Sequence, residues 1–134
     1  MKYMLDTNIC IFIIKNKHES VLAKLKNAIN EGICISSITL AELEHGVALS
    51  VYPSKNSEAL LKFLSLPAIL PFDAKAASKY GMIRADLQKK GALIGQMDLL
   101  IAAHAMANSC VLATNNKREF DRIVGLTVED WVNQ

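Results

Sequence analysis

Short apolar runs alternate along this chain with longer segments in which apolar residues recur at helical spacing. This alternation predicts strands at residues 2–5, 33–35, 68–72, 110–113 and 126–128. It predicts helices at residues 7–15, 20–30, 38–49, 57–66, 74–90, 97–108 and 117–123. Strands that alternate with helices favour right-handed crossovers, which produce a parallel sheet covered on both faces. We therefore predict an α/β fold with a central, mostly parallel sheet of about five strands, flanked by helices on both faces.

Glycine, proline and capping residues mark where several of these elements begin and end. Gly32 predicts the end of the second helix. Asp73 and the serine pair at 36–37 are typical N-caps of the helices that follow them. Pro53 is interpreted as a break between two helices, the second of which begins at Ser57.

Length and composition restrict the class of protein. The chain has 134 residues, of which 51% are hydrophobic, so we expect a single globular domain over residues 1–134 and no disordered chain. No apolar run approaches the roughly 18 residues that span a membrane, and the apolar start is too short for a signal peptide. We therefore expect a cytoplasmic protein with no membrane partner.

The cysteines do not indicate a metal or redox site. Cys10, Cys34 and Cys110 lie far apart in apolar segments, and none of them forms a C-x-x-C pair. This pattern argues against structural zinc and thioredoxin-like chemistry. We interpret all three as buried thiols.

Acidic residues interrupt the pattern near the ends of predicted strands. In open α/β sheets, ligands bind beyond the carboxyl ends of the strands. Asp6 directly follows the first strand, where it could equally cap the helix that begins at Thr7. Glu42 and Glu44 lie in the helix after the second strand, and periodicity alone does not choose between them.

Asp98 interrupts a segment that is otherwise almost entirely apolar. Between Met97 and Asn108, the polar residues are Asp98, His104 and Asn108, which predicts a buried helix. A charge there is unfavourable unless it is paired or bound to a cation, although in the first turn it could also complement the helix dipole. His104 lies about 240° around the helix from Asp98, so we interpret it as a structural histidine.

A fourth polar cluster follows the fourth predicted strand. It comprises Thr114, Asn115, Asn116 and Glu119, whereas Asp121 points elsewhere and is expected in solvent. Hard cations such as Mg²⁺ or Mn²⁺ take oxygen ligands of this kind. The chain has no Gly-rich phosphate loop, no Ser-His-acid arrangement and no Cys-His pair. The chemistry of the residues therefore favours a metal-dependent phosphodiester hydrolase.

Four segments resemble, in order and spacing, the motifs of PIN-domain ribonucleases. They are residues 4–8 (MLDTN), 35–46 (ISSITLAELEHG), 94–105 (IGQMDLLIAAHA) and 114–120 (TNNKREF), and together they span nearly the whole chain. Within that family, the chain is most similar to the VapC toxins of bacterial VapBC toxin–antitoxin modules. The resemblance favours Glu42 over Glu44 as the acid of the second motif.

The resemblance implies an endoribonuclease whose acidic pocket binds Mg²⁺ or Mn²⁺. Asp6, Glu42 and Asp98 would be its core acids. Glu119 would supply the fourth carboxylate, because many family members have an acid where this chain has Asn116. Water that the metal activates would attack phosphorus in line. The residues that would orient the carboxylates or their waters are Thr7, Thr114 and Asn116.

The resemblance also implies partners. The substrate would be RNA, with cleavage of initiator tRNA in its anticodon stem-loop as the leading prediction, and this cleavage would inhibit translation. The chain would form a homodimer and would be neutralised by a VapB-type antitoxin. The antitoxin would lay an apolar segment in a groove between the N-terminal helices and place a basic residue near the acids.

Basic residues near the third and fourth motifs are candidate phosphate contacts. The net charge is +2, with 12 lysines and 3 arginines, so most contacts to RNA would come from lysine. The candidate residues are Arg84, Lys89, Lys90, Lys117 and Arg118. The same residues are also typical of a solvated helix face.

The main alternative is a catalytically weak PIN-fold protein that binds RNA or a protein partner. It predicts the loss of at least one core acid, whereas all three are present. An aspartyl-phosphate phosphatase would need a second aspartate two residues after Asp6, where this chain has Asn8. A receiver domain would need an acidic pair before the first helix and a lysine at a later strand end, and neither is evident.

Overall fold

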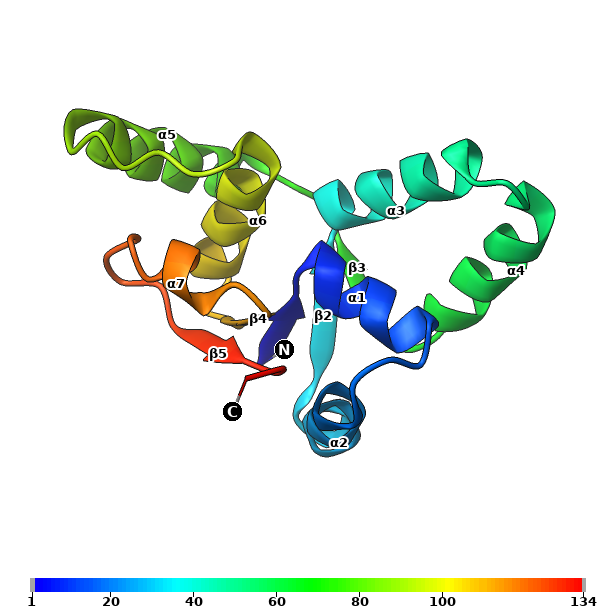
Figure 1. The fold of residues 1–134 in the computed structure, drawn as a ribbon. Coiled ribbons are helices and arrows are strands. Elements are labelled where there is room, and N and C mark those ends of the chain that lie inside the picture. Colours follow the sequence, from blue (N-terminus) through cyan, green and yellow to red (C-terminus); the bar gives the residue numbers. More distant parts are fainter. Residues whose placement is uncertain (1, 134) are drawn as a thin grey trace.

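The computed structural model describes residues 2–133, which form a five-stranded sheet and seven α-helices (Figure 1). The strands are β1 (Tyr3–Leu5), β2 (Ile33–Ser36), β3 (Ala68–Leu70), β4 (Val111–Thr114) and β5 (Val128–Asp130). The helices are α1 (Thr7–Ile14), α2 (Glu19–Ala28), α3 (Ser37–Leu49), α4 (Pro53–Phe63), α5 (Ala74–Lys89), α6 (Gln96–Ala107) and α7 (Lys117–Phe120). A short 3₁₀ helix, Ile29–Glu31, follows α2. Within the described residues, no helix combines the length and the apolar character needed to cross a membrane.

The five strands are all parallel, in the order β3-β2-β1-β4-β5. Tyr3 of the central strand β1 pairs with Ile33 of β2 on one side and with Val111 of β4 on the other. Along the sequence, β2 and β3 are added on one side of β1, with β3 at the edge of the sheet. The chain then crosses to the other side of β1, where it forms β4 and the second edge strand, β5. The change of direction lies between β1 and β4, and sheets of this kind bind their ligands beyond the strand ends at that point.

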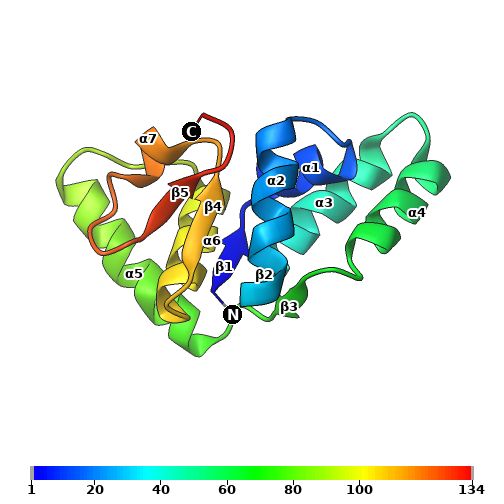
Figure 2. The same ribbon diagram turned by 90° about the horizontal axis from the view of Figure 1, so that it is seen from below.

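Helices cover both faces of the sheet, as the sequence predicts. Tyr3 and Leu5 lie in a core with buried residues of α1, α2, α3 and α4. Met4 points to the opposite face and lies in a second core with α5 and α6. Figures 1 and 2 show these two groups of helices on opposite sides of the strands. The alternation of side chains along a strand thus separates the two cores.

The predicted boundaries are confirmed where a cap defines them. Ser36 accepts a hydrogen bond from the Ile38 amide at 3.0 Å and caps α3. Asp73 accepts one from the Ala76 amide at 3.0 Å and caps α5. Gly32 ends the 3₁₀ helix with φ 96°, a conformation that glycine adopts without strain.

Other boundaries differ from the prediction. Helix α4 begins at Pro53, not at Ser57, because proline fits the first turn of a helix, where its missing N–H has no partner to lose. The last strand lies at Val128–Asp130, two residues beyond the predicted start, because Val128 is the residue in register with Leu112 of β4. Helix α7 ends at Phe120 and β3 ends at Leu70, so both are shorter than predicted.

The three thiols are buried, as the sequence predicts. Cys10 lies on the buried face of α1, in the first core. Cys34 and Cys110 lie on the two sides of β1, and their sulfur atoms are 4.0 Å apart. These residues therefore contribute to packing around the central strand.

Candidate active site

Four carboxylates come from four separate elements. Asp6 follows β1, Glu42 lies in α3, Asp98 lies in the first turn of α6, and Glu119 lies in α7. The charges of Asp6, Glu42 and Glu119 all raise the pKa of Asp98, so the four groups share one electrostatic environment. The fold thus brings together acids that are up to 113 residues apart in the sequence, from Asp6 to Glu119.

Asp6 is buried and caps α1. Only 4% of the residue is exposed, and its Oδ1 accepts a hydrogen bond from the Ile9 amide at 2.9 Å. Burial raises the pKa of its carboxyl to about 6, although hydrogen bonds from Thr114 and from backbone amides act in the opposite direction. A carboxylate that caps a helix ordinarily has a lowered pKa. The capping interpretation is therefore correct, but burial and the nearby charge of Glu42 outweigh the effect of the cap.

Glu42 is the acid of α3 that reaches the site. It is half-buried, and its Oε1 accepts a hydrogen bond from the hydroxyl of Thr7 in the first turn of α1. Glu44 is exposed and lies outside this contact. The structure therefore places Glu42 where its charge acts on Asp6 and Asp98.

Asp98 is half-buried at the start of α6. Burial and the charge of Glu119 are the two largest causes that raise the pKa of its carboxyl to about 7. A hydrogen bond with Glu119 raises it further. Its position in the first turn favours the charged form. Because the pKa is raised nonetheless, complementing the helix dipole does not account for this residue.

The turn after β4 links two of the acids through hydrogen bonds. Asn116 donates from Nδ2 to Oε2 of Glu119 at 3.0 Å. The backbone amide of Asn116 donates to the Thr114 hydroxyl at 3.0 Å, and that hydroxyl bonds to Asp6. Asp121 is exposed, as the sequence predicts, and it pairs with Lys117. Thr114 and Asn116 thus contact the carboxylates that they are predicted to orient.

His104 has a structural environment, as the sequence predicts. It is 1% exposed, and its Nδ1 lies 2.8 Å from the Ser36 hydroxyl. Its ring packs edge-on against Phe72, with 5.4 Å between the centroids. Burial lowers its pKa, which favours the neutral ring. His104 therefore joins α6 to the start of α3 in the core.

Thr39 is a residue near the site that the sequence reasoning did not identify. It is fully buried in α3, and its Oγ1 lies 3.5 Å from Oγ1 of Thr7. Its signal in the sequence is its position three residues before Glu42, which places both on one face of the helix. The relation to Thr7 depends on how α1 and α3 pack, and no local pattern contains it.

The five candidate phosphate contacts are all exposed. They are Arg84, Lys89, Lys90, Lys117 and Arg118. Lys90 pairs with Asp86 at 3.0 Å and Lys117 pairs with Asp121 at 2.8 Å. Among residues 2–133, Lys89 and Arg118 form no such ion pair, so their charges are available to a ligand.

The donor set suits a hard cation. Among the described residues, no three side chains of His, Cys, Asp or Glu are grouped closely enough to enclose a metal ion as they stand. The four acids nevertheless supply only oxygen donors, which Mg²⁺ and Mn²⁺ prefer. Their mutual repulsion raises the pKa of Asp98, and a bound cation would relieve that repulsion. The residues present therefore fit a divalent cation by charge and by donor type.

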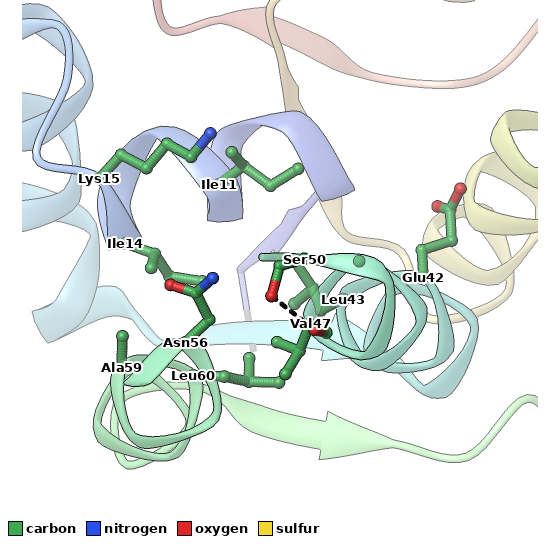
Figure 3. A pocket seen from close by; sticks show the side chains of 11 residues that line it. Ile11, Ile14, Lys15, Glu42, Leu43, Val47, Ser50, Asn56, Ala59 and Leu60 are labelled. Carbon is green, nitrogen blue, oxygen red and sulfur yellow. Dashed lines mark hydrogen bonds between the residues drawn. The ribbon is translucent and has the colours of Figure 1, made fainter. Parts of the chain in front are cut away.

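A groove of about 240 Å³ lies between α1, α3 and α4, beside Glu42. Its apolar lining comes from Ile11, Ile14, Leu43, Val47, Ala59 and Leu60. Figure 3 shows Glu42 at one end of this groove, with its carboxylate turned away from the apolar lining. The groove therefore leads from an apolar surface to the acidic site.

Nearly the whole chain matches the model of one known protein family. A model of the PIN domain matches residues 3–126. The chain belongs to the PIN-domain family. The resemblance of the four motifs is thereby confirmed.

This PIN domain is similar to VapC proteins over almost its entire length. It is 45% identical to ribonuclease VapC2 of Haemophilus influenzae, with 98% of this chain and 99% of that protein covered. It is 46% identical to the tRNA(fMet)-specific endonuclease VapC of Shigella flexneri, with 98% of each covered.

Solved structures give the same relationship. The PIN domain matches a chain of VapBC2 from Rickettsia felis, bound to a promoter DNA fragment, with a TM-score of 0.93 and 45% identity over 98% and 99% of the two chains. It matches DNA-bound VapBC from Salmonella typhimurium with a TM-score of 0.92 and 45% identity over 98% of each chain. These similarities place it in the VapC group of PIN domains.

Proposed function

We propose that this PIN domain is the toxin of a VapBC module and hydrolyses RNA phosphodiester bonds with Mg²⁺ or Mn²⁺. The observation that carries the proposal is the placement of four acids from four separate elements, such that the charges of Asp6, Glu42 and Glu119 act on Asp98. Four carboxylates held in partly buried positions repel one another, and such repulsion is typical of a site built for a cation.

Each residue of the site has a distinct part in this proposal. Asp6, Glu42, Asp98 and Glu119 would hold the metal. When bound, a divalent cation lowers the pKa of a water and neutralises charge on the scissile phosphate. The hydrogen-bond partners of these acids keep the carboxylates oriented: Thr7 for Glu42, Thr114 for Asp6 and Asn116 for Glu119.

The substrate that we propose is tRNA. The VapC proteins of Shigella flexneri and Salmonella typhimurium, each 46% identical to this chain, are named tRNA(fMet)-specific endonucleases. We propose that cleavage falls in the anticodon stem-loop of initiator tRNA and leaves a 5′-phosphate and a 3′-hydroxyl. Loss of initiator tRNA would stop translation in the bacterial cytoplasm.

The partner that we propose is a VapB-type antitoxin, within an assembly that also contains a toxin homodimer. Three solved relatives, from Rickettsia felis, Salmonella typhimurium and nontypeable Haemophilus influenzae, are VapBC complexes. The groove between α1, α3 and α4 is lined mainly by apolar side chains, with Lys15, Ser50 and Asn56 among them and Glu42 at one end. It fits an apolar segment of an antitoxin that ends in a basic residue, which would occupy the position of the metal or of a phosphate.

The test is cleavage of total bacterial RNA by purified, antitoxin-free protein. Reactions contain Mg²⁺, Mn²⁺ or EDTA, and they compare the wild type with Asp98→Asn and with Asp86→Asn. Asp86 is an exposed acid of α5 paired with Lys90, so it is a matched control for loss of one carboxylate. We expect a discrete tRNA fragment that requires metal, disappears in Asp98→Asn and persists in Asp86→Asn. A folded wild-type protein that cuts nothing with either metal would favour the binding-module alternative.

A further inference from the structure

Thr39 has a buried hydroxyl whose partner lies on another helix. The residue is 0% exposed, and its side chain meets Thr7 of α1, with 3.5 Å between the two Oγ1 atoms. No buried side-chain oxygen or nitrogen in residues 2–133 lacks a partner. Burying a hydroxyl is unfavourable without a hydrogen bond, and valine has nearly the same shape. The contact with Thr7 is therefore the interaction that compensates for burying the Thr39 hydroxyl.

The number of protons fixes the direction of this contact. The hydroxyl of Thr7 has one proton, and Oε1 of Glu42 accepts it. Because Thr7 donates to Oε1 of Glu42, it has no second proton for Thr39. Either hydroxyl can donate across the 3.5 Å between the two oxygens, and with the Thr7 proton directed to Glu42 the donor is Thr39. The three groups form a directed chain from Thr39 through Thr7 to Glu42.

We propose that Thr39 is a positioning residue for Glu42 and acts through Thr7, an inference that rests on the proposed function. Hydrogen bonds in a chain polarise one another, so the Thr39 hydroxyl strengthens the donation from Thr7 to the carboxylate. It also selects the Thr7 rotamer that faces Glu42. The chain joins α1, which begins at the end of β1, to α3, which begins at the end of β2. It therefore fixes the position of Glu42 relative to Asp6, which directly precedes Thr7.

The substitution pair Thr39→Val and Thr39→Ser separates this role from packing. Valine keeps the volume and removes the hydroxyl, whereas serine keeps the hydroxyl and removes the methyl group. The exposed Thr127 offers Thr127→Val as a matched control away from the acids. The measurements are Mn²⁺ affinity by calorimetry without RNA, kcat and KM for tRNA cleavage, and the free energy of unfolding in EDTA.

We expect Thr39→Val to weaken Mn²⁺ binding about fivefold and to lower kcat about tenfold with little change in KM. Thr39→Ser should remain within about twofold of the wild type in Mn²⁺ affinity even if it unfolds more easily, because the hydroxyl and not the methyl group carries the role. Combining Thr39→Val with Thr7→Val should be no worse than Thr7→Val alone, because Thr39 acts through Thr7. The free energies of unfolding in EDTA of the two single variants and the double variant should be non-additive in the same way.

Other outcomes overturn the inference. If the serine variant loses more Mn²⁺ affinity than the valine variant, or if the two substitutions are additive, Thr39 serves packing alone. If the wild type binds Mn²⁺ and cuts RNA, and Thr39→Val has the same Mn²⁺ affinity and cleavage rate, the proposed function stands but Thr39 has no part in it. A wild type that neither binds Mn²⁺ nor cuts RNA overturns the proposed function and, with it, the role of Thr39.

Discussion

Asp98, at the start of α6, and Glu119, in α7, share a hydrogen bond between their carboxyl groups, and the charge of Glu119 raises the pKa of Asp98. Two carboxyl groups form such a contact only when a proton lies between them. At neutral pH without metal, the pair is therefore close to the point at which that proton is lost. This relationship has consequences for stability, for metal binding and for the role of Glu119.

Removing the Asp98 charge should stabilise the metal-free protein at high pH. The folded-state pKa values of Asp6, about 6, and Asp98, about 7, lie above the unfolded value of 3.8, so the folded state binds more protons between these limits. Their contribution to stability is present at low pH and is lost as the pH rises through about 6 to 7. Since Asp98 is partly exposed, we expect Asp98→Asn to raise the free energy of unfolding by about 1–2 kcal/mol at pH 8.

Denaturant unfolding in EDTA, at about pH 5 and about pH 8, measures this effect. The gain should shrink toward the lower pH, where the Asp98 carboxyl is already protonated. Asp86→Asn, which removes an exposed acid, should show no such pH-dependent gain. Equal stability of Asp98→Asn and the wild type at both pH values would contradict the raised pKa.

Divalent metal should stabilise the wild type and not Asp98→Asn. A ligand that binds only the folded state at about 100 times its dissociation constant adds about 2.7 kcal/mol to the free energy of unfolding. We expect Mn²⁺ to raise the Tm of the wild type by roughly 5–10 °C, and Ca²⁺ to have a smaller effect. Thermal unfolding with each metal and with EDTA measures this. An equal rise in Asp98→Asn would show that the metal binds elsewhere.

Glu119 should supply the fourth carboxylate, with Asn116 holding it. Glu119→Gln should lower tRNA cleavage about 10-fold to 100-fold, and Asn116→Ala should have a smaller effect, because the amide contacts only the carboxylate. Adding Asn116→Asp to Glu119→Gln moves the carboxylate by three positions and should restore part of the activity. Single-turnover cleavage rates at saturating Mn²⁺ distinguish these variants. Full activity of Glu119→Gln would remove it from the site.

Sequence reasoning predicted the sheet, both helical layers and the strand ends that carry the acids. It succeeded because Tyr3, Met4 and Leu5 are buried on alternate faces, and because Asp73 caps its helix through local hydrogen bonds. It placed the start of α4 at Ser57 because Pro53 was interpreted as a break, although proline is equally suited to the first turn. Local patterns fix caps well, but one residue type can signal either an end or a start.

The site was predicted less completely than the fold. Periodicity left Glu42 and Glu44 open, because the choice depends on where α3 faces α1. The contact of Thr39 with Thr7 has no local signal, since Thr7 is 32 residues away on another helix. Contacts between side chains of different elements follow from packing, which a single sequence does not display.

Neutralising the candidate phosphate contacts should weaken RNA binding and flatten its salt dependence. Each lysine or arginine that touches a phosphate contributes about 1 to the slope of log affinity against log salt. We expect Lys89→Gln and Arg118→Gln to lower the slope by about that amount each, and Lys90→Gln by less, because Lys90 is already paired with Asp86. Binding is measured with Asp98→Asn protein, which leaves the RNA intact. The exposed Lys26 of α2 provides the control Lys26→Gln, and a slope equal in all variants would exclude these contacts.

Filling the groove beside Glu42 should block the antitoxin and spare the nuclease. A Cβ atom at Gly46 of α3 would meet nothing within 4 Å, so Gly46→Leu can extend into the groove without strain and gains helix propensity of roughly 1 kcal/mol. Gly81 of α5 has equally open space outside the groove, so Gly81→Leu is the matched control. We expect Gly46→Leu to cut tRNA at the wild-type rate. We expect it to bind its cognate antitoxin more than about tenfold more weakly, because the leucine side chain occupies the groove that the apolar segment would fill. Undiminished antitoxin binding by Gly46→Leu, measured by calorimetry, would place the antitoxin on another face.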